Sequence, residues 1–199
     1  RRGGSRGNDR GRPFAVGRGG TILHFDGRSW TRQPSGTKAD LSAVWGSSST
    51  DVYAAGAHGT LLHYDGTRWT QPVRSFGWRW TFTAIGGTSS GNVYLAGWRT
   101  PSGELGNERE GVVLRYDGRA WTEVAGGHTQ LVEGLWAASP DEVYFVGPAL
   151  NGLEQIRLFD GQVFRVVDTE SRIAPQGIWS ATTGEVFVVG TNGFALTKR

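Results

Sequence analysis

Short apolar runs alternate with polar turns along the chain after its first twelve residues. Between Leu41 and Thr70 the runs read LSAVW, the polar turn GSSST, DVYAAG, TLLHY and, after Asp-Gly, RWT. β-Branched and aromatic residues dominate these runs, and the apolar positions do not follow the i, i+3, i+4 spacing of an amphipathic helix. The pattern predicts an all-β chain in which each such stretch forms four short strands, called a to d below.

The same stretch recurs several times. The phrase GTLLHYDGTRWT, which starts at Gly59, returns as GTILHFDGRSWT, as GVVLRYDGRAWT and, in diverged form, as EQIRLFDGQVFR. The phrase before it, LSAVWGSSSTDVYAAG, recurs as well, and the glycines that close its copies are Gly17, Gly56, Gly97, Gly147 and Gly190. They are separated by 39, 41, 50 and 43 residues, which is typical of the blade period of a β-propeller.

A four-stranded sheet with apolar residues on both faces has to stack against other sheets, and radial stacking achieves this. We therefore predict a β-propeller of four-stranded antiparallel blades over residues 13–199. Strands a and d occur in four repeats and strands b and c in five, so about five blades are expected, the first without strand a and the last without strand d. Either the two ends share a blade and close the ring, or the chain is a fragment of a larger propeller.

An Asp-Gly pair separates strands c and d in four repeats. Asp-Gly between apolar runs is a strong hairpin signal, because glycine accepts a positive φ without a Cβ clash. We predict a type I′ turn at each pair. The four pairs are Asp26-Gly27, Asp65-Gly66, Asp117-Gly118 and Asp160-Gly161.

The basic charge of the chain is concentrated at its start. Residues 1–12 hold five arginines and one aspartate, or +4, whereas the whole chain is +3, so the rest sums to −1. We expect this Gly/Arg-rich segment to be a flexible, solvated tail whose contacts with nucleic acid, if any, are non-specific. The chain has no cysteine and no apolar run of about eighteen residues, so disulfides, thiolate chemistry and a membrane-spanning helix are not expected.

The phrases WGSSSTDVYAAG and GTLLHYDGTRWT together resemble tandem repeats of large extracytoplasmic bacterial proteins of the propeller type. The resemblance covers about residues 12–199 and departs at Phe164, which replaces the tryptophan of the other repeats. It implies a propeller fold and an extracytoplasmic location (periplasmic, cell-surface or secreted). It supplies no active site, because fold alone does not define function.

Residues that recur at one repeat position are interpreted as framework, since every blade needs them equally. We expect six tryptophans to be core or blade-interface residues, because Trp is highly buried on average: Trp30, Trp45, Trp69, Trp121, Trp136 and Trp179. His24 and His63 recur in strand c, where the third repeat has Arg115. Since arginine cannot replace a metal-binding or catalytic histidine, both are predicted to be strand residues.

Signs of catalysis or of a cofactor are weak. The sequence contains no HExxH motif and no nucleophile elbow, since GTSSG (residues 87–91) falls in a polar turn between two expected strands, and its aspartates cluster in turns. Glu104, Glu108 and Glu110 lie close together in sequence, but a calcium site takes six to eight oxygens, often with a sharper Asp/Asn spacing. We predict a non-enzymatic chain with no catalytic residue, metal or cofactor.

The better candidates are two stretches that break the repeat. Segment 71–80 (QPVRSFGWRW) joins strand d to strand a of the next blade, and segment 98–110 replaces a short link between strands b and c of that blade. In an antiparallel blade these two kinds of link leave from the same rim, so the segments should be neighbours. The predicted binding residues are Arg74, Phe76, Trp78, Arg79, Trp80, Trp98, Arg99, Glu104, Glu108 and Arg109.

Aromatic residues and arginines on loops are typical anchors of recognition surfaces. The leading hypothesis is a recognition or scaffold propeller that binds a protein partner. A lectin-like propeller that binds glycans is the alternative, although a lectin based on blade symmetry should repeat its site. A propeller hydrolase or lyase is the third hypothesis. For each aromatic residue the competing interpretation is that it covers a blade edge.

Overall fold

The computed structural model describes residues 13–73, 75–101, 109–129, 131–148, 154–167, 175–180, 186–191 and 195–198. Within them the chain forms five antiparallel sheets, three strands in the first and last and four in each of the others. The strand order in every sheet follows the chain order. The predicted all-β fold is confirmed, with the first sheet lacking strand a and the last lacking strand d.

The strands of the first two sheets are β1 (Phe14–Gly17), β2 (Thr21–Phe25), β3 (Trp30–Gln33), β4 (Leu41–Ser48), β5 (Asp51–Gly56), β6 (Leu61–Tyr64) and β7 (Trp69–Thr70), with one 3₁₀ turn η1 (Arg18–Gly20). The third sheet holds β8 (Trp80–Ser89), β9 (Asn92–Arg99), β10 (Glu110–Tyr116) and β11 (Trp121–Thr129). The last two hold β12 (Gly134–Ser139), β13 (Glu142–Pro148), β14 (Glu154–Phe159), β15 (Phe164–Val167), β16 (Pro175–Ser180), β17 (Val186–Gly190) and β18 (Ala195–Lys198).

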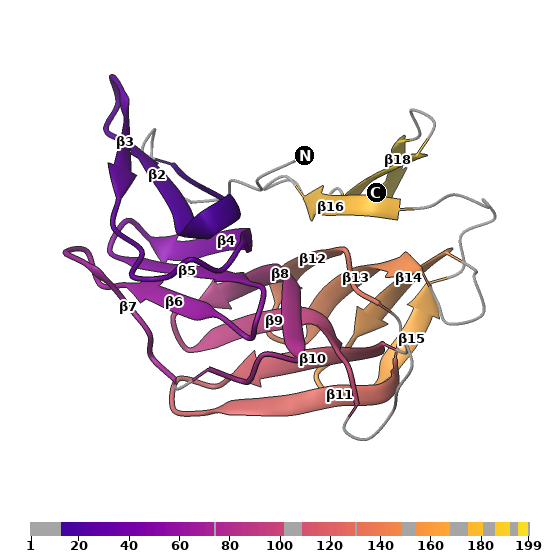
Figure 1. Ribbon diagram of the computed structural model, residues 1–199. Coiled ribbons are helices and arrows are strands. Elements are labelled where there is room, and N and C mark those ends of the chain that lie inside the picture. The colour runs from indigo at the N-terminus through magenta and orange to yellow at the C-terminus, as the bar shows by residue number, and fades with distance from the viewer. Residues whose placement is uncertain are drawn as a thin grey trace.

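Figure 1 shows the sheets following one another in an open arc, from the indigo first sheet to the yellow last one. The first strands β4, β8, β12 and β16 pack in succession, so strand a of each blade contacts strand a of the next. This is the radial packing of propeller blades. Among the described residues no helix is long and apolar enough to cross a membrane.

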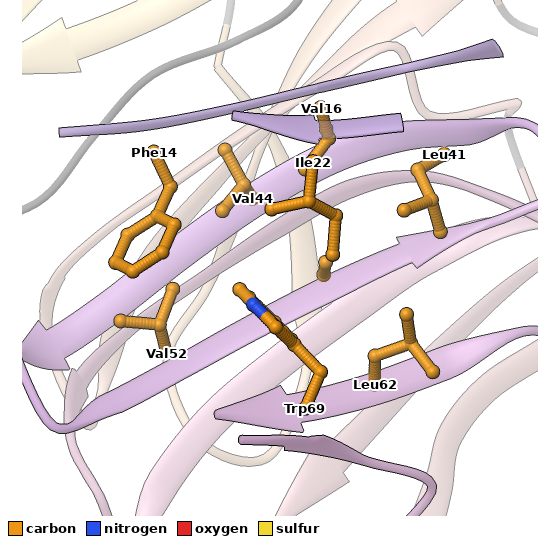
Figure 2. Close-up of a cluster of buried hydrophobic side chains, with 9 residues drawn as sticks. Phe14, Val16, Ile22, Leu41, Val44, Val52, Leu62 and Trp69 are labelled. Atoms are coloured by element: carbon orange, nitrogen blue, oxygen red, sulfur yellow. The ribbon is translucent and has the colours of Figure 1, made fainter. Parts of the chain in front are cut away.

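The hydrophobic core lies between the sheets. Figure 2 shows one interface, where Phe14 and Ile22 of the first sheet meet Val44, Val52 and other apolar side chains of the second. Similar clusters fill the second-to-third, third-to-fourth and fourth-to-fifth interfaces. Burial of one such side chain stabilises the fold by about 1.5–3 kcal/mol, so each sheet depends on its neighbours.

The recurring tryptophans occupy the interfaces, with two exceptions. Trp69 is buried, whereas Trp30 is 48% exposed and Trp179 is 37% exposed. Trp69 contacts Phe14 of the preceding sheet edge-on at 5.5 Å, but Trp30 has no preceding sheet within the described chain. Strand a tryptophans pack against the following sheet, as Trp45 and Trp136 do. Trp179 lies in the last sheet of the described chain and has no following sheet to pack against. The prediction of a core position is therefore wrong for these two.

The glycine that closes strand b is required by close contact with strand a. A Cβ on Gly56 would lie 2.0 Å from the carbonyl oxygen of Asp40, and one on Gly97 would lie 2.0 Å from that of Thr81. A Cβ on Gly17 would meet nothing within 4 Å, since its sheet has no strand a. The repeated glycine is thus explained by the packing of the neighbouring strand.

The predicted type I′ turn is wrong. That turn needs positive φ at both central residues, yet in the described chain His58 is the one non-glycine residue with positive φ. At the second repeat Gly66 has φ +93°, and the Asp65 carboxylate accepts backbone N–H groups of Thr67 and Arg68 at 2.8 and 2.9 Å. The short carboxylate takes these donors itself and fixes a different turn, an arrangement typical of Asp in turns.

Replacing Gly97 with alanine should therefore destabilise the fold, by about 1–3 kcal/mol, because the new methyl group meets a backbone carbonyl that cannot rotate away. The matched variant Gly17→Ala should cost under about 0.5 kcal/mol. Urea unfolding measures both. Equal losses would show that the closing glycine is not selected by contact with strand a.

The Asp65 turn predicts a pH dependence. The hydroxyl of Thr67 and the two backbone N–H groups lower the pKa of Asp65 to about 2. Since this lies below the ordinary value of about 3.9, ionised Asp65 stabilises the fold above pH 4, and this contribution is lost as the pH falls toward 2. The urea midpoint difference between wild type and Asp65→Asn should shrink over that range. A difference independent of pH would contradict the prediction.

Candidate functional site

Segment 71–80 is held against the rim of the second sheet. Pro72 lacks an amide N–H and cannot extend the pairing of β7, so the chain leaves the sheet there. The hydroxyl of Ser75 donates to the carbonyl of His58 at 2.8 Å, and the amide of Gly59 donates to the carbonyl of Trp80 at 2.8 Å. These bonds fix the second half of the segment to the turn between β5 and β6.

Gly59 makes this contact possible. Its φ is +62°, and a Cβ there would lie 2.8 Å from backbone atoms of Gly77. The preceding interface has a similar bond, from the amide of Gly20 to the carbonyl of Ala39 at 2.8 Å. A hydrogen bond between the b–c turn and the next d–a link therefore recurs in both interfaces. Segment 71–80 is the d–a link that makes this bond in the second.

The two predicted segments lie side by side. Trp80 pairs with Arg99 in the β8–β9 ladder, and the amide of Thr100 donates to the carbonyl of Arg79 at 3.1 Å. The Arg79 guanidinium donates to the carbonyl of Pro101 at 2.8 Å. Arg74, Glu104 and Glu108 lie outside the described residues.

Two of the predicted binding residues are part of the core. Phe76 and Trp80 both contact Phe82, with ring centroids 5.2 and 6.0 Å apart, and they contact each other at 5.7 Å. All three pack into the cluster between the second and third sheets. Phe76 and Trp80 therefore follow the competing interpretation, in which the aromatic residue covers a blade edge and does not face a ligand.

Arg99 is engaged within its own sheet. Its guanidinium lies 5.1 Å from the centroid of the Trp80 ring and forms ion pairs with Glu110 at 2.9 Å and Glu123 at 2.7 Å. Burial opposes the charge, but the bonds and charges of the two glutamates outweigh it and raise the pKa of Arg99. The arginine therefore links β9, β10 and β11 and has little capacity left for a ligand.

Trp98 faces the opposite side of β9 from Arg99, because successive side chains of a strand alternate. The Arg109 guanidinium lies 4.1 Å from the centroid of the Trp98 ring, a cation–π contact. Trp98 is half-buried and Arg109 is exposed. The predicted residues thus divide between the two faces of the third sheet.

Trp78 is the exposed aromatic residue of the rim. Its side chain is 73% exposed, and the Arg79 guanidinium lies 5.0 Å from its ring centroid. The backbone on either side is bonded: the amide of Phe76 donates to the carbonyl of Gly59 at 3.4 Å, and the carbonyl of Arg79 accepts from the amide of Thr100 at 3.1 Å. The ring is therefore presented to solvent by an ordered backbone.

The titratable groups of the strands form structural pairs. His63 lies 2.7 Å from the Asp51 carboxylate and 4.5 Å from the Tyr53 ring. In the third sheet Arg115 and Asn92 replace His63 and Asp51 and bond to each other at 3.1 Å. The pair has changed together, which fits packing rather than catalysis.

Ser47 also donates to the Asp51 carboxylate, so the carboxylate, not the histidine, is the central group. The described residues contain no group of three or more His, Asp or Glu side chains that could hold a metal ion. Residues 126–128 lie in β11, which extends to Thr129.

Sequence reasoning missed a cavity of about 400 Å³ between the second and third sheets. It is lined by Tyr53, Pro72, Val73, Phe76, Tyr116, Arg119, Ala120 and Trp121. One sequence signal was available, Pro72, because proline cannot continue the pairing of a strand. In the structure β7 has two residues, whereas the matching β11 has nine.

The position of Arg99 predicts a stability role. Arg99→Met should lower the free energy of unfolding by about 1–2 kcal/mol, because two partly exposed ion pairs and a cation–π contact are lost. Arg109→Met, which removes one exposed stacking contact, should cost about 0.5 kcal/mol. Urea unfolding compares the two variants. A larger loss at Arg109 would assign the framework role to the wrong arginine.

Three solved structures illustrate the similarity, and each is distant in sequence from the chain. YCF48 bound to D1 peptide has 14% identity and a TM-score of 0.65 over 96% of this chain and 60% of YCF48. The Pan2 WD40 domain of Neurospora crassa has 14% identity and a TM-score of 0.67 over 96% of this chain and 59% of the domain. The fucose-specific lectin of Aleuria aurantia has 16% identity and a TM-score of 0.58 over 94% and 69%.

No family model and no curated protein matches the chain. The chain spans about three fifths of the length of YCF48 and of the Pan2 domain. At these identities the likeness concerns the fold alone. The fold is that of a β-propeller, formed here by five successive blade sheets.

Proposed function

We propose that this chain is a non-enzymatic recognition or scaffold module that binds a protein partner through segments 71–80 and 98–110. The observation that carries the proposal is the 73% exposure of Trp78 on a backbone that is hydrogen-bonded at Phe76 and at Arg79. Tryptophan and arginine are the residues most enriched at binding hot spots. Because the loop is already ordered, little conformational entropy is lost when a partner covers the ring.

The contrast between residues that recur in every repeat and residues that do not supports the proposal. Trp78 has no counterpart in the other repeats, and Arg79 beside it provides a charged group for hydrogen bonds. Among similar folds, YCF48 is described as bound to D1 peptide, and another belongs to a nidogen/laminin complex. The module is proposed to act outside the cytoplasm, in an assembly, on the basis of the tandem-repeat resemblance.

A glycan-binding function is the second candidate. An exposed indole ring offers a stacking platform for a sugar ring, and fucose-specific lectins are among the similar folds. Among the described residues of this rim Trp78 is the one exposed tryptophan, whereas a lectin based on blade symmetry should repeat its platform. A hydrolase or lyase has less support, because the histidine and carboxylate pairs of the strands are engaged in packing contacts.

The test uses a photo-crosslinking amino acid, p-benzoyl-L-phenylalanine, placed at position 78 or, as a matched control, at exposed position 30. In the source organism, position 78 should yield a specific protein adduct and position 30 should not. With the purified partner, Trp78→Ala should raise Kd at least tenfold by calorimetry, while Trp30→Ala leaves Kd unchanged. Both variants should keep the melting temperature within about 2 °C, as is usual for exposed sites.

A glycan array run with wild type and Trp78→Ala separates the two candidates. Binding to a defined glycan that disappears in Trp78→Ala would replace the protein partner by a carbohydrate. Equal adducts from positions 78 and 30, or an unchanged Kd in Trp78→Ala, would reject the rim as the binding surface.

A further inference from the structure

The cavity between the second and third sheets lies where the first-to-second interface has a closely packed aromatic pair. In the first-to-second interface Trp69 is buried against Phe14, with ring centroids 5.5 Å apart. The equivalent pair in the next interface is Tyr53 and Trp121, at 6.2 Å. Trp121 is half-buried and forms part of the cavity wall.

The opening results from the early end of β7. After two paired residues the chain turns away from β6, and Pro72, Val73 and Phe76 form one wall of the cavity. The opposite wall is the hairpin between β10 and β11, with Tyr116, Ala120 and Trp121. A volume of about 400 Å³ lies within the range of ~300–1,000 Å³ typical of ligand sites.

The chemistry of the walls is mostly apolar, with one cation. Trp121 and Tyr116 stack at 5.2 Å and present a flat aromatic surface. The hydroxyl of Tyr116 donates to the carbonyl of Gly118 at 3.0 Å, so it is already engaged. Burial and the Asp51 charge raise the pKa of Tyr53 to about 12, so its hydroxyl remains a neutral donor.

Arg119 supplies the charge. It lies on the hairpin turn and lines the cavity, and it forms no ion pair with the part of the chain that the structure describes. Its backbone amide is fixed by the Asp117 carboxylate at 2.8 Å. A guanidinium of this kind is suited to a carboxylate, which it binds through charge-assisted hydrogen bonds.

We propose that this cavity is a peptide-binding subsite that accepts a bulky apolar side chain, with a neighbouring carboxylate of the peptide bound by Arg119. A sugar would leave several hydroxyl groups without partners on the apolar walls, and this carries a free-energy penalty. A leucine or phenylalanine side chain instead buries apolar surface against Trp121 and Val73. The subsite shares segment 71–80 with the proposed function, but Trp78 is not among its lining residues, so variants at Trp78 and at Arg119 test the two proposals separately.

The probe is the peptide acetyl-Gly-Ser-Asp-Phe-Gly-Ser-amide, compared with versions in which Asn replaces Asp or Ala replaces Phe. Titrations follow the indole N–H signals of the whole chain by NMR, with Trp121 assigned by substitution. The parent peptide should shift the Trp121 signal, and each replacement should weaken binding at least fivefold.

Matched variants use the repeat itself. Arg119→Gln should weaken binding of the Asp peptide at least fivefold and binding of the Asn peptide less than twofold. Arg28→Gln changes the same turn position in the first repeat, whose backbone amide is held by Asp26 at 2.7 Å, and should have no effect. Ala120→Trp should fill the cavity and abolish binding, whereas Ser29→Trp, its counterpart, should not.

Equal binding of the Asp and Asn peptides would show that the peptide carboxylate is not recognised. Equal effects of the Arg119 and Arg28 substitutions would show that the cavity is not the binding site. Displacement of the parent peptide by α-methyl-L-fucoside, with loss in Ala120→Trp, would assign the site to sugars instead. If Ala120→Trp fails to fold, Arg119→Gln, which changes an exposed side chain, still decides the question.

Discussion

The face-to-face contact of successive sheets is the interaction on which the rest of the structure depends. Each sheet carries apolar side chains on both faces, so it is stable as part of a stack and not alone. The recurring residues serve this contact: an aromatic residue of strand b packs on the strand d aromatic of the next sheet, as Phe14 does on Trp69. Where the stack ends, the same residue type is exposed, as Trp30 and Trp179 show.

This constraint separates framework from surface more clearly than residue type does. A histidine beside a carboxylate is a common sign of catalysis. The third sheet, however, replaces the pair His63–Asp51 with Arg115–Asn92 and keeps both the hydrogen bond and the position over the strand b tyrosine. Arginine 99 is also an interaction candidate by type, but its two glutamates and Trp80 occupy it. Residues with no counterpart and no internal partner are better guides to binding.

Much of the fold could be predicted because the repeat averages out local ambiguity. Five copies of one pattern located the strands of the described chain, and they predicted that segments 71–80 and 98–110 are neighbours, as the contact of Arg79 with Thr100 shows. Side-chain direction could not be predicted for residues outside the repeat: nothing in the sequence shows that Trp80 turns inward while Trp78 turns outward. The Asp-Gly turn was misread because its carboxylate, rather than a second positive φ, organises the backbone. The cavity was missed because it arises from the length of β7, a property of pairing.

One departure from the repeat, segment 71–80, contributes to both candidate surfaces. Pro72 ends β7 early, and the extra residues that follow have to travel from the outer strand of the second sheet to the first strand of the third. In this segment Phe76 packs inward and, with Val73, lines the cavity beside Trp121. Trp78 lies on the outside of the same segment and is exposed. The loss is a few strand pairs, whose hydrogen bonds contribute about 0.5–1.5 kcal/mol each. The stacked sheets on either side tolerate this loss, because their stability comes from the interfaces rather than from the outer edge.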